Sequence, residues 1–246
     1  MPIILITGSG KRIGKGLTFR FAEKGWDVII HYNSSEKGAM NLKDNIEALG
    51  RKSYLIKSDI TDYDQVKEAF GNAFEQFGIP DVLINNSGVF PDKTNLSEIT
   101  TELWESTMNI NLRGILYTSQ IYSEYKKKGS RIVNIASLGG LEIWKNRIPY
   151  NISKSGAIQL TKALARELAP DIAVNCICPG SILVDEEPSI TDTTLIDIKK
   201  IPMGRLGCVD DVFDAAWFFA NCSSYITGQV ITVDGGYHLA GHLLSD

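Results

Sequence analysis

The chain has 246 residues, 43% of them hydrophobic and 22% charged, so it can bury a sizeable core and is not expected to be disordered. Its net charge of −4 argues against a nucleic-acid or membrane partner, and no apolar run reaches the ~18 residues that span a bilayer. The first residues lack the pattern of a signal peptide and the four cysteines lack a disulfide pattern, so we expect a cytoplasmic protein.

Apolar, strand-like runs alternate with amphipathic stretches of helical length along the chain. Strands are expected at 3–7, 27–32, 53–57, 81–85, 131–136, 172–178 and 230–233. Helices are expected at 13–24, 36–49, 63–77, 101–128 with a break near Met108, 150–168 and 209–220. This alternation with short links predicts an α/β fold, a doubly wound parallel sheet with helices on both faces. We interpret 1–246 as one Rossmann-type domain in which the irregular stretch of about 180–203 is a substrate lid.

A glycine-rich turn follows the first expected strand. Gly8, Gly10 and Gly14 lie in this turn, and the third glycine comes one residue later than in the G-x-G-x-x-G fingerprint. Such glycines let the backbone turn sharply and approach a pyrophosphate, whose charge is stabilised at the N-terminus of the next helix. The place of this glycine-rich turn at the first strand–helix junction therefore predicts a dinucleotide site.

The end of the second expected strand indicates which dinucleotide is bound. NAD-binding proteins typically have an acid there that holds the ribose 2′-hydroxyl. This chain instead reads His31-Tyr32-Asn33-Ser34, and its first acid is Glu36. The Ser34 hydroxyl and the basic Lys11 and Arg12 of the glycine turn could hold a 2′-phosphate. We therefore favour NADP(H) over NAD(H).

Three further side chains have the chemistry of a proton-transfer site. Tyr150 and Lys154 are one helical turn apart at the start of an expected helix, which places them on one face. The pKa of a free tyrosine, about 10, is too high for efficient proton exchange near neutrality, and a neighbouring ammonium lowers it. Ser137, at the end of the preceding strand, could hold a substrate oxygen while Tyr150 transfers the proton.

With these motifs in this order, the chain resembles the short-chain dehydrogenase/reductase family over essentially its whole length. The matching pieces are Thr7-Gly8-x-x-x-x-Ile13-Gly14, Asp59, Asn85-Asn86-Ser87-Gly88, Asn111, Ser137, Tyr150-x-x-x-Lys154, Pro179-Gly180 and Ile226-Thr227-Gly228…Val233-Asp234-Gly235-Gly236. The resemblance implies that Tyr150 is the general acid in reduction and the base in oxidation. It implies that Lys154 lowers the pKa of Tyr150 and holds the nicotinamide ribose. Ser137 would orient the substrate carbonyl, and Asn111 would anchor a water that relays protons.

The resemblance also implies the contacts of the bound molecules. The expected cofactor contacts are Gly8, Lys11, Arg12, Ile13, Tyr32, Asn33, Ser34, Asp59, Ile60, Asn86, Ser87, Gly88, Tyr150, Lys154, Pro179, Gly180 and Ile182. Phe90, Leu141 and Trp144 are expected to contact the substrate, a small carbonyl or alcohol molecule, and no metal site is expected. The two long helices, about 108–128 and 150–168, correspond to the usual subunit interface of the family, which implies a homotetramer.

Departures from the family pattern leave alternatives open. Arg12 replaces the usual glycine, and Arg12 and Phe90 are similar to the pteridine reductase branch, although Ser137 suits a ketone or alcohol better than a pterin. The basic residues 126–128 are similar to the carrier-docking surface of 3-oxoacyl-acyl-carrier-protein reductases, but acidic residues of the lid, within 185–197, should repel an acidic carrier. A third alternative is an NADP(H)-binding sensor without activity, for which the complete set of catalytic residues would have no use.

Overall fold

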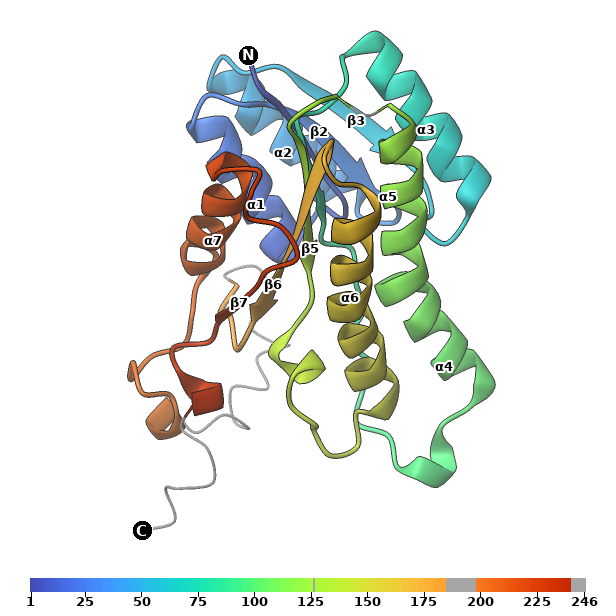
Figure 1. Ribbon diagram of the computed structural model, residues 1–246, viewed down its shortest axis with the longest axis vertical. Helices are drawn as coiled ribbons and strands as arrows, with labels where there is room; N and C mark the ends of the chain where they lie inside the picture. Colours follow the sequence, from blue (N-terminus) through green and yellow to red (C-terminus); the bar gives the residue numbers. More distant parts are fainter. Residues whose placement is uncertain (126, 185–197, 240–246) are drawn as a thin grey trace.

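The computed structural model describes residues 1–125, 127–184 and 198–239. Parallel strands form one seven-stranded sheet in the order β3-β2-β1-β4-β5-β6-β7 (Figure 1). The strands are β1 (Ile3–Ile6), β2 (Asp27–Tyr32), β3 (Ser53–Lys57), β4 (Val82–Asn85), β5 (Ser130–Ile135), β6 (Ile172–Pro179) and β7 (Val230–Val233). The order of the strands reverses between β1 and β4, and open sheets of this kind bind ligands at the carboxyl ends of the strands at such a reversal.

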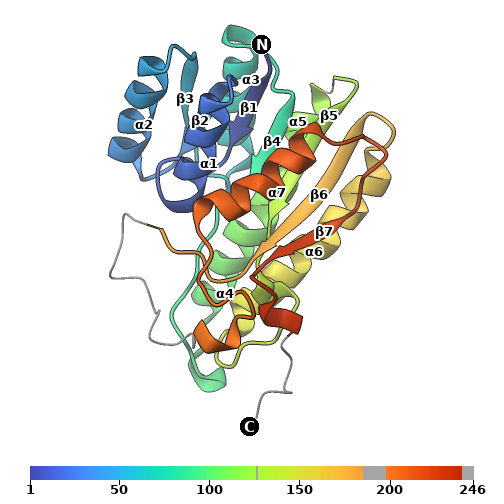
Figure 2. The same ribbon diagram turned by 90° about the vertical axis from the view of Figure 1, so that its left-hand side faces the viewer.

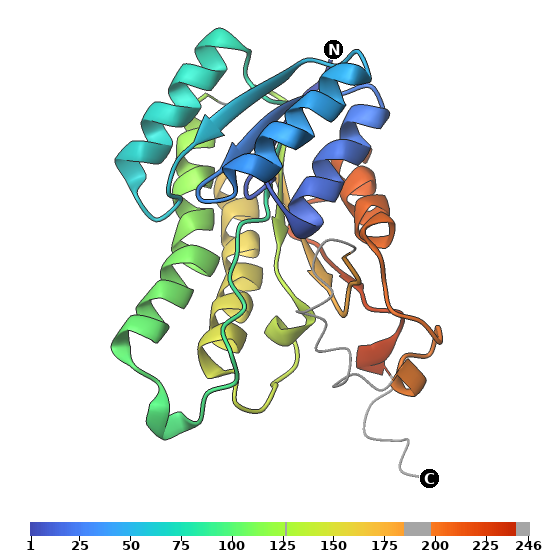
Figure 3. The same cartoon turned by 180° about the vertical axis from the view of Figure 1, so that it is seen from behind.

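The helices cover both faces of the sheet, which confirms the predicted doubly wound fold. They are α1 (Arg12–Glu23), α2 (Glu36–Ala48), α3 (Tyr63–Gln76), α4 (Thr101–Met108), α5 (Gly114–Glu124), α6 (Ile148–Glu167) and α7 (Val209–Asn221). Figure 2 shows α1, α2 and α7 in front of the sheet, and Figure 3 shows the opposite layer with α3, α5 and α6. Each layer has its own apolar core against the sheet.

The strands are apolar at successive positions because both of their faces are buried. In β1, Ile4 and Ile6 pack in the core under α1, α2 and α7, whereas Leu5 between them packs in the core under α3, α5 and α6. All three side chains are fully buried. A strand that faced water on one side would alternate apolar and polar residues, and these strands do not.

The bounds of several elements differ from the predicted ones. The predicted helix 101–128 is broken as expected after Met108, by a π-helical turn (Asn109–Arg113), but it ends early, at Glu124. Helix α6 begins two residues before Tyr150, because Pro149 occupies the first turn, where its missing N–H leaves no hydrogen bond unmade. Strand β6 runs on to Pro179, which pairs with Val233.

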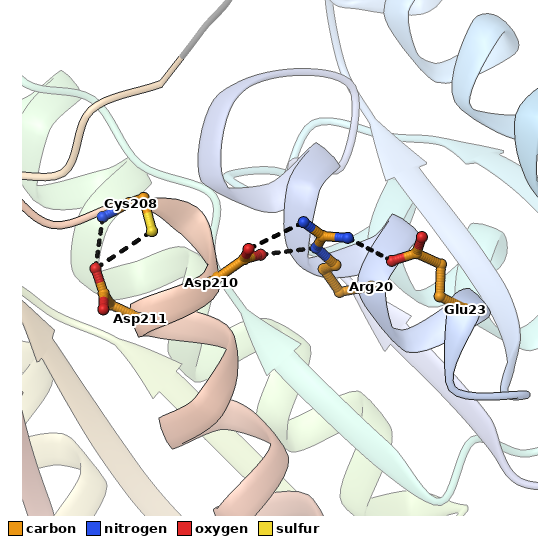
Figure 4. A network of polar contacts seen from close by, with 5 residues as sticks. All are labelled: Arg20, Glu23, Cys208, Asp210 and Asp211. Atoms are coloured by element: carbon orange, nitrogen blue, oxygen red, sulfur yellow. Dashed lines mark hydrogen bonds and ion pairs between the residues drawn. The ribbon is translucent and has the colours of Figure 1, made fainter.

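Helix α7 is held against the C-terminal end of α1. Arg20 of α1 donates hydrogen bonds to Asp210 (2.7 and 3.0 Å) and to Glu23 (2.7 Å), as Figure 4 shows. In the same view the Asp211 carboxylate accepts a hydrogen bond from the Cys208 backbone N–H at the start of α7. Arg20 lies in the last turn of α1 and Asp210 in the first turn of α7, so these contacts join the C-terminal end of α1 to the N-terminal end of α7.

Candidate active site

The turn between β1 and α1 packs directly on the segment after β4. The Asn86 side-chain amide donates to the carbonyls of Thr7 (2.9 Å) and Gly8 (3.3 Å), and the Thr7 hydroxyl accepts from the backbone N–H groups of Asn86 and Ser87. A Cβ at Gly14 would lie 2.3 Å from the Gly8 carbonyl oxygen, so no larger residue fits there. The late third glycine is therefore required by packing. The turn has the tight, glycine-lined backbone that a dinucleotide pyrophosphate needs.

A buried histidine at the end of β2, His31, holds this turn through a hydrogen bond. The Nδ1 atom of His31 accepts the Gly8 backbone N–H at 3.1 Å, and its Nε2 lies 3.1 Å from the Ser58 hydroxyl. Because Nδ1 accepts, the imidazole is neutral with its proton on Nε2. Burial lowers the pKa of His31 to about 4. Sequence reasoning did not assign this role, although a polar side chain at the end of an apolar strand was a signal for it.

The residues predicted to hold a 2′-phosphate lie around the start of α1 and the end of β2. Lys11 is exposed at the N-cap of α1, and Asn33 and Ser34 are exposed beyond β2. A Cβ at Gly10 would lie 2.1 Å from the Ser35 hydroxyl oxygen, so the two loops touch. The first acid after β2, Glu36, faces Lys57 with 3.9 Å between the carboxylate and the ammonium.

Tyr32, Asp59 and Ile60 are also predicted to contact the cofactor, and they lie at the carboxyl ends of β2 and β3, where they are less exposed. Tyr32 and Ile60 are buried, and Ile60 packs on Gly114 at the start of α5. The Asp59 carboxylate accepts hydrogen bonds from the Thr61 N–H (2.9 Å) and hydroxyl (2.8 Å), which shapes the loop after β3.

Arg12 and Ile13, at the start of α1, are half-buried. Arg12 has a φ of 53°, a left-handed conformation in which the family usually has glycine.

Asn111 lies in the π-helical turn between α4 and α5, a kind of irregularity that often marks a functional position. It is fully buried. Its amide bridges two elements: Oδ1 accepts the Val89 N–H (2.8 Å), and Nδ2 donates to the Val89 carbonyl and to the Ser153 hydroxyl (both 3.0 Å). In this structure Asn111 therefore clamps the segment after β4 to helix α6. Its predicted role in anchoring a water stays a prediction.

Ser137, Tyr150 and Lys154 are brought together beside the same segment. Ser137 follows β5, and its hydroxyl oxygen accepts the Gly139 N–H at 3.1 Å. The Lys154 ammonium donates to the Ile135 carbonyl at 3.0 Å. All three predicted side chains are buried. A Cβ at Gly88 would lie 3.4 Å from the Lys154 Nζ, so Gly88 leaves room for that ammonium.

Burial acts on both ionisable groups of this site. It raises the pKa of the Tyr150 phenol to about 12, and hydrogen bonding with Ser137 opposes the rise. Burial lowers the pKa of Lys154 to about 8. The sequence predicted that Lys154 would lower the pKa of Tyr150. That role of Lys154 stays a prediction. The Lys154 ammonium donates to the Ile135 carbonyl, and Arg147 and Arg12 are two further cations whose charge opposes the rise in the pKa of Tyr150.

Two aromatic rings flank the Tyr150 ring. The Phe90 ring centroid lies 4.6 Å from that of Tyr150 and meets it edge-on at 77°. Trp144 is nearly parallel to Tyr150, at 14° and 6.1 Å between centroids. The structure thus places two of the predicted substrate residues against the predicted proton donor. Leu141, the third, is exposed in the turn after Ser137.

The predicted lid begins at the end of β6. The Gly180 N–H donates to the Val233 carbonyl at 2.9 Å, and Ile182 forms an isolated bridge with Gly207. Residues 185–197, with the acidic side chains that the sequence places there, lie outside the described residues, as does Lys126. The next lysine of that basic run, Lys127, is paired with Asp81 at 2.6 Å.

Within 1–125, 127–184 and 198–239, no three His, Cys, Asp or Glu side chains gather in a way that could hold a metal ion. No helix of those same segments combines the length and the apolar character needed to cross a membrane.

Comparisons with known proteins identify the family. A family model described as enoyl-(acyl carrier protein) reductase matches residues 8–238. The 3-oxoacyl-(acyl-carrier-protein) reductase FabG of Staphylococcus aureus (strain N315) is 32% identical over 240 residues, which cover 96% of this chain and 97% of that protein. The FabG protein of Thermotoga maritima is 35% identical over 241 residues, covering 95% and 96% of the two chains.

Solved structures with a similar fold indicate the same family. A short chain dehydrogenase from Burkholderia cenocepacia J2315 in complex with NADP has a TM-score of 0.90 and 32% identity, covering 96% of this chain and 98% of that one. A blue fluorescent protein from a metagenomic library in complex with NADPH has a TM-score of 0.89 and 32% identity, with 96% and 97% covered. The chain belongs to the short-chain dehydrogenase/reductase family, which confirms the predicted class of oxidoreductase.

The burial of His31 predicts how stability depends on pH. Between about pH 6 and pH 4 the unfolded chain binds a proton that the folded chain does not, because the folded pKa is about 4. The contribution of His31 to the free energy of unfolding should therefore fall by about 1.4 kcal/mol per pH unit as the pH is lowered through this window. Urea unfolding of wild type and His31→Gln at several pH values measures it. We expect a shallower pH dependence in the variant, and equal slopes would contradict the neutral, buried histidine.

Proposed function

We propose that this protein is an NADP(H)-dependent oxidoreductase that interconverts the carbonyl and alcohol forms of a small molecule. The observation that carries the proposal is the meeting of Ser137 and Tyr150, two buried hydroxyl groups from the segment after β5 and from α6. A carbonyl oxygen bound there would have one hydroxyl to orient it and another to give it a proton.

The assignment of NADP(H) as the cofactor is supported by the shape of the glycine turn, which suits a pyrophosphate. Its glycines are required by packing, and the N-terminus of α1 follows them, so a pyrophosphate can be held by backbone N–H groups. Lys11 and Ser34 are exposed where a 2′-phosphate would need donors, and the end of β2 has no acid to repel it. Similar proteins solved in complex with NADP and with NADPH support the same choice.

Each residue has a defined task in the proposed reduction. Bound NADPH supplies the hydride. Tyr150 donates its phenolic proton to the carbonyl oxygen, and Ser137 orients that oxygen beside it. Lys154 is placed by the Ile135 carbonyl for contact with the cofactor ribose, and Asn111 keeps the segment after β4 fixed on α6. In oxidation the same phenol, as the phenolate, accepts the proton of the alcohol.

Two observations each favour a more specific class of substrate. The FabG proteins, 32–35% identical to this chain, bear the name 3-oxoacyl-(acyl-carrier-protein) reductase, which supports a 3-oxoacyl thioester as one candidate. The edge of Phe90 against Tyr150 supports the other candidate, a flat ring such as a pterin, because aromatic walls favour flat apolar groups. A sensor without activity is the non-enzymatic alternative, and the buried Ser137–Tyr150 pair argues against it.

We further propose a homotetramer in the cytoplasm, built from one Rossmann-type catalytic domain per chain. The exposed face of α6 supports the assembly, because Ile152 is 45% exposed there, near the start of the helix predicted to pair with a second subunit. The four cysteines occur as free thiols, which supports a reducing compartment. The single-domain interpretation of 1–246 and the substrate lid at about 180–203 stay predictions.

Tyr150→Phe tests the proton donor. We expect kcat with NADPH and a diketone to fall at least about 100-fold, because general acid catalysis of this kind contributes 10²–10⁴-fold. The affinity for NADPH, measured by fluorescence titration, should change by less than about threefold, since the phenyl ring keeps the same shape. Tyr54→Phe removes an exposed phenol on β3 and is the matched control. A wild-type kcat in Tyr150→Phe would contradict the mechanism.

Lys11→Ala tests the cofactor. A charge-assisted hydrogen bond to the 2′-phosphate contributes about 1.5–3 kcal/mol, so we expect the Kd for NADPH to rise roughly 10- to 100-fold. The Kd for NADH should hardly change, because NADH lacks this phosphate. Lys43→Ala, on the exposed face of α2, removes an equal charge and should leave both constants unchanged. An equal loss for NADPH and NADH would refute the placement of the 2′-phosphate at Lys11.

Light scattering after gel filtration tests the assembly. At micromolar concentration we expect four times the mass of one chain for wild type, and a smaller species for Ile152→Glu, because a buried carboxylate is costly in an apolar interface. Leu49→Glu, at an equally exposed position after α2, should remain tetrameric. A monomeric wild type would contradict the tetramer.

A further inference from the structure

The loop that leads into α6 is tied to the segment after β4 at two points. The Thr94 N–H donates to the Asn146 carbonyl at 3.0 Å, and the Arg147 guanidinium donates to the Pro91 carbonyl. Two consecutive residues of the loop thereby hold the residues that follow Phe90. The position of Phe90 at the site consequently depends on this loop.

Arg147 is itself an unusual residue at this position. It is only 8% exposed, although a buried guanidinium loses its hydration and needs compensating contacts. The compensation comes from the Pro91 carbonyl and from the Phe90 ring, whose centroid lies 4.1 Å from the guanidinium carbon. The same Phe90 ring meets Tyr150 edge-on at 4.6 Å. The cation therefore contacts the aromatic ring, and the aromatic ring contacts the phenol ring.

These contacts place the positive charge of Arg147 near the phenol. Several groups face Tyr150 from the elements around it: Ser137 after β5, Arg12 from α1, Cys178 from β6 and Arg147 from the loop before α6. Lys154 lies on the same helix, directed at the Ile135 carbonyl. Of the cations, Arg147 opposes the burial-driven rise in the pKa of Tyr150 more strongly than Arg12 does.

We propose that Arg147 is a positioning residue for the proposed reaction: its guanidinium holds Phe90 against the Tyr150 ring and keeps a buried positive charge beside the phenol. The inference rests on the proposed function, because it concerns how Tyr150 is prepared to exchange its proton. It adds a loop arginine to the electrostatic task that the sequence predicts for Lys154.

Changing Arg147 can remove its positive charge, its planar contact with Phe90, or both, and the two losses should have different kinetic effects. A positive charge favours the phenolate, so its removal raises the pH at which Tyr150 ionises. In alcohol oxidation the phenolate is the base, and the ascending limb of log kcat/KM against pH moves to higher pH by about one unit. At a pH well below the limb this is about a tenfold loss of kcat/KM, since the phenolate fraction falls tenfold per unit. Loss of the planar contact with Phe90 should instead raise KM and leave the limb in place.

Variants of Arg147 and Phe90 test the two effects, with NADP+ and a secondary alcohol as the probe. Arg147→Met removes the charge and keeps the length of the side chain, so the limb should shift. Arg147→Lys keeps the charge but not the planar group, and Phe90→Leu keeps Arg147 itself. In both we expect an unshifted limb and a higher KM. Lys145→Gln removes an exposed charge from the same loop and should alter neither quantity. Arg147→Gln is the second neutral variant, for use where Arg147→Met does not fold.

A direct titration of the phenol separates this inference from the proposed function. The NMR signal of the Tyr150 ring carbon that bears oxygen is identified by its absence in Tyr150→Phe. It should begin to shift at lower pH in wild type and Arg147→Lys than in Arg147→Met. The same onset in all three would overturn the role of Arg147, as would an unshifted limb in both neutral variants. A later onset in Arg147→Met, together with a wild type that has no turnover, would support Arg147 and refute the proposed reaction.

Discussion

The phenol of Tyr150 and the ammonium of Lys154 are both buried, and a low-dielectric environment disfavours the charged form of each. Burial raises the pKa of Tyr150 to about 12 and lowers that of Lys154 to about 8. A proton donor in such a place keeps its proton near neutrality, which suits reduction. Oxidation needs the phenolate, which positive charge near the phenol favours. Arg147 and Arg12 supply such charge and oppose the burial-driven rise in the pKa of Tyr150.

The crevice that receives a ligand depends in turn on close backbone approach between β1 and β4. Gly14 lets the turn after β1 pack on Asn86, and Gly88 leaves room for Lys154 at the end of β4. His31 holds the turn from the other side through the Gly8 N–H. The cofactor turn and the proton-transfer residues therefore share one rigid support, the segment after β4, which Asn111 clamps to α6. A change in that segment would affect both halves of the site.

Strand–helix alternation was sufficient to predict the doubly wound sheet, because strands buried on both faces, such as β1, are apolar at every position. Short motifs at strand ends were sufficient to predict that Ser137, Tyr150 and Lys154 meet. The hydrogen-bond partner of Lys154 was harder to predict. Helical spacing puts Lys154 on the face of Tyr150, but the Ile135 carbonyl, which accepts a hydrogen bond from its ammonium, lies on strand β5. Arg147 could not be found from the sequence, since its importance arises from contacts with Phe90 and Pro91.

The central claim is that this protein transfers a hydride from NADPH to a carbonyl carbon while Tyr150 protonates the oxygen. The most direct measurement follows the hydrogen atoms during reduction of a diketone, with NADPH deuterated at both positions of nicotinamide carbon 4 in ordinary water. The account predicts one deuterium per product molecule, on the carbon that carries the new hydroxyl, with NADPH consumed in equal amount. A reduced product without deuterium at that carbon, or no reduced product while NADPH is bound, would contradict the account.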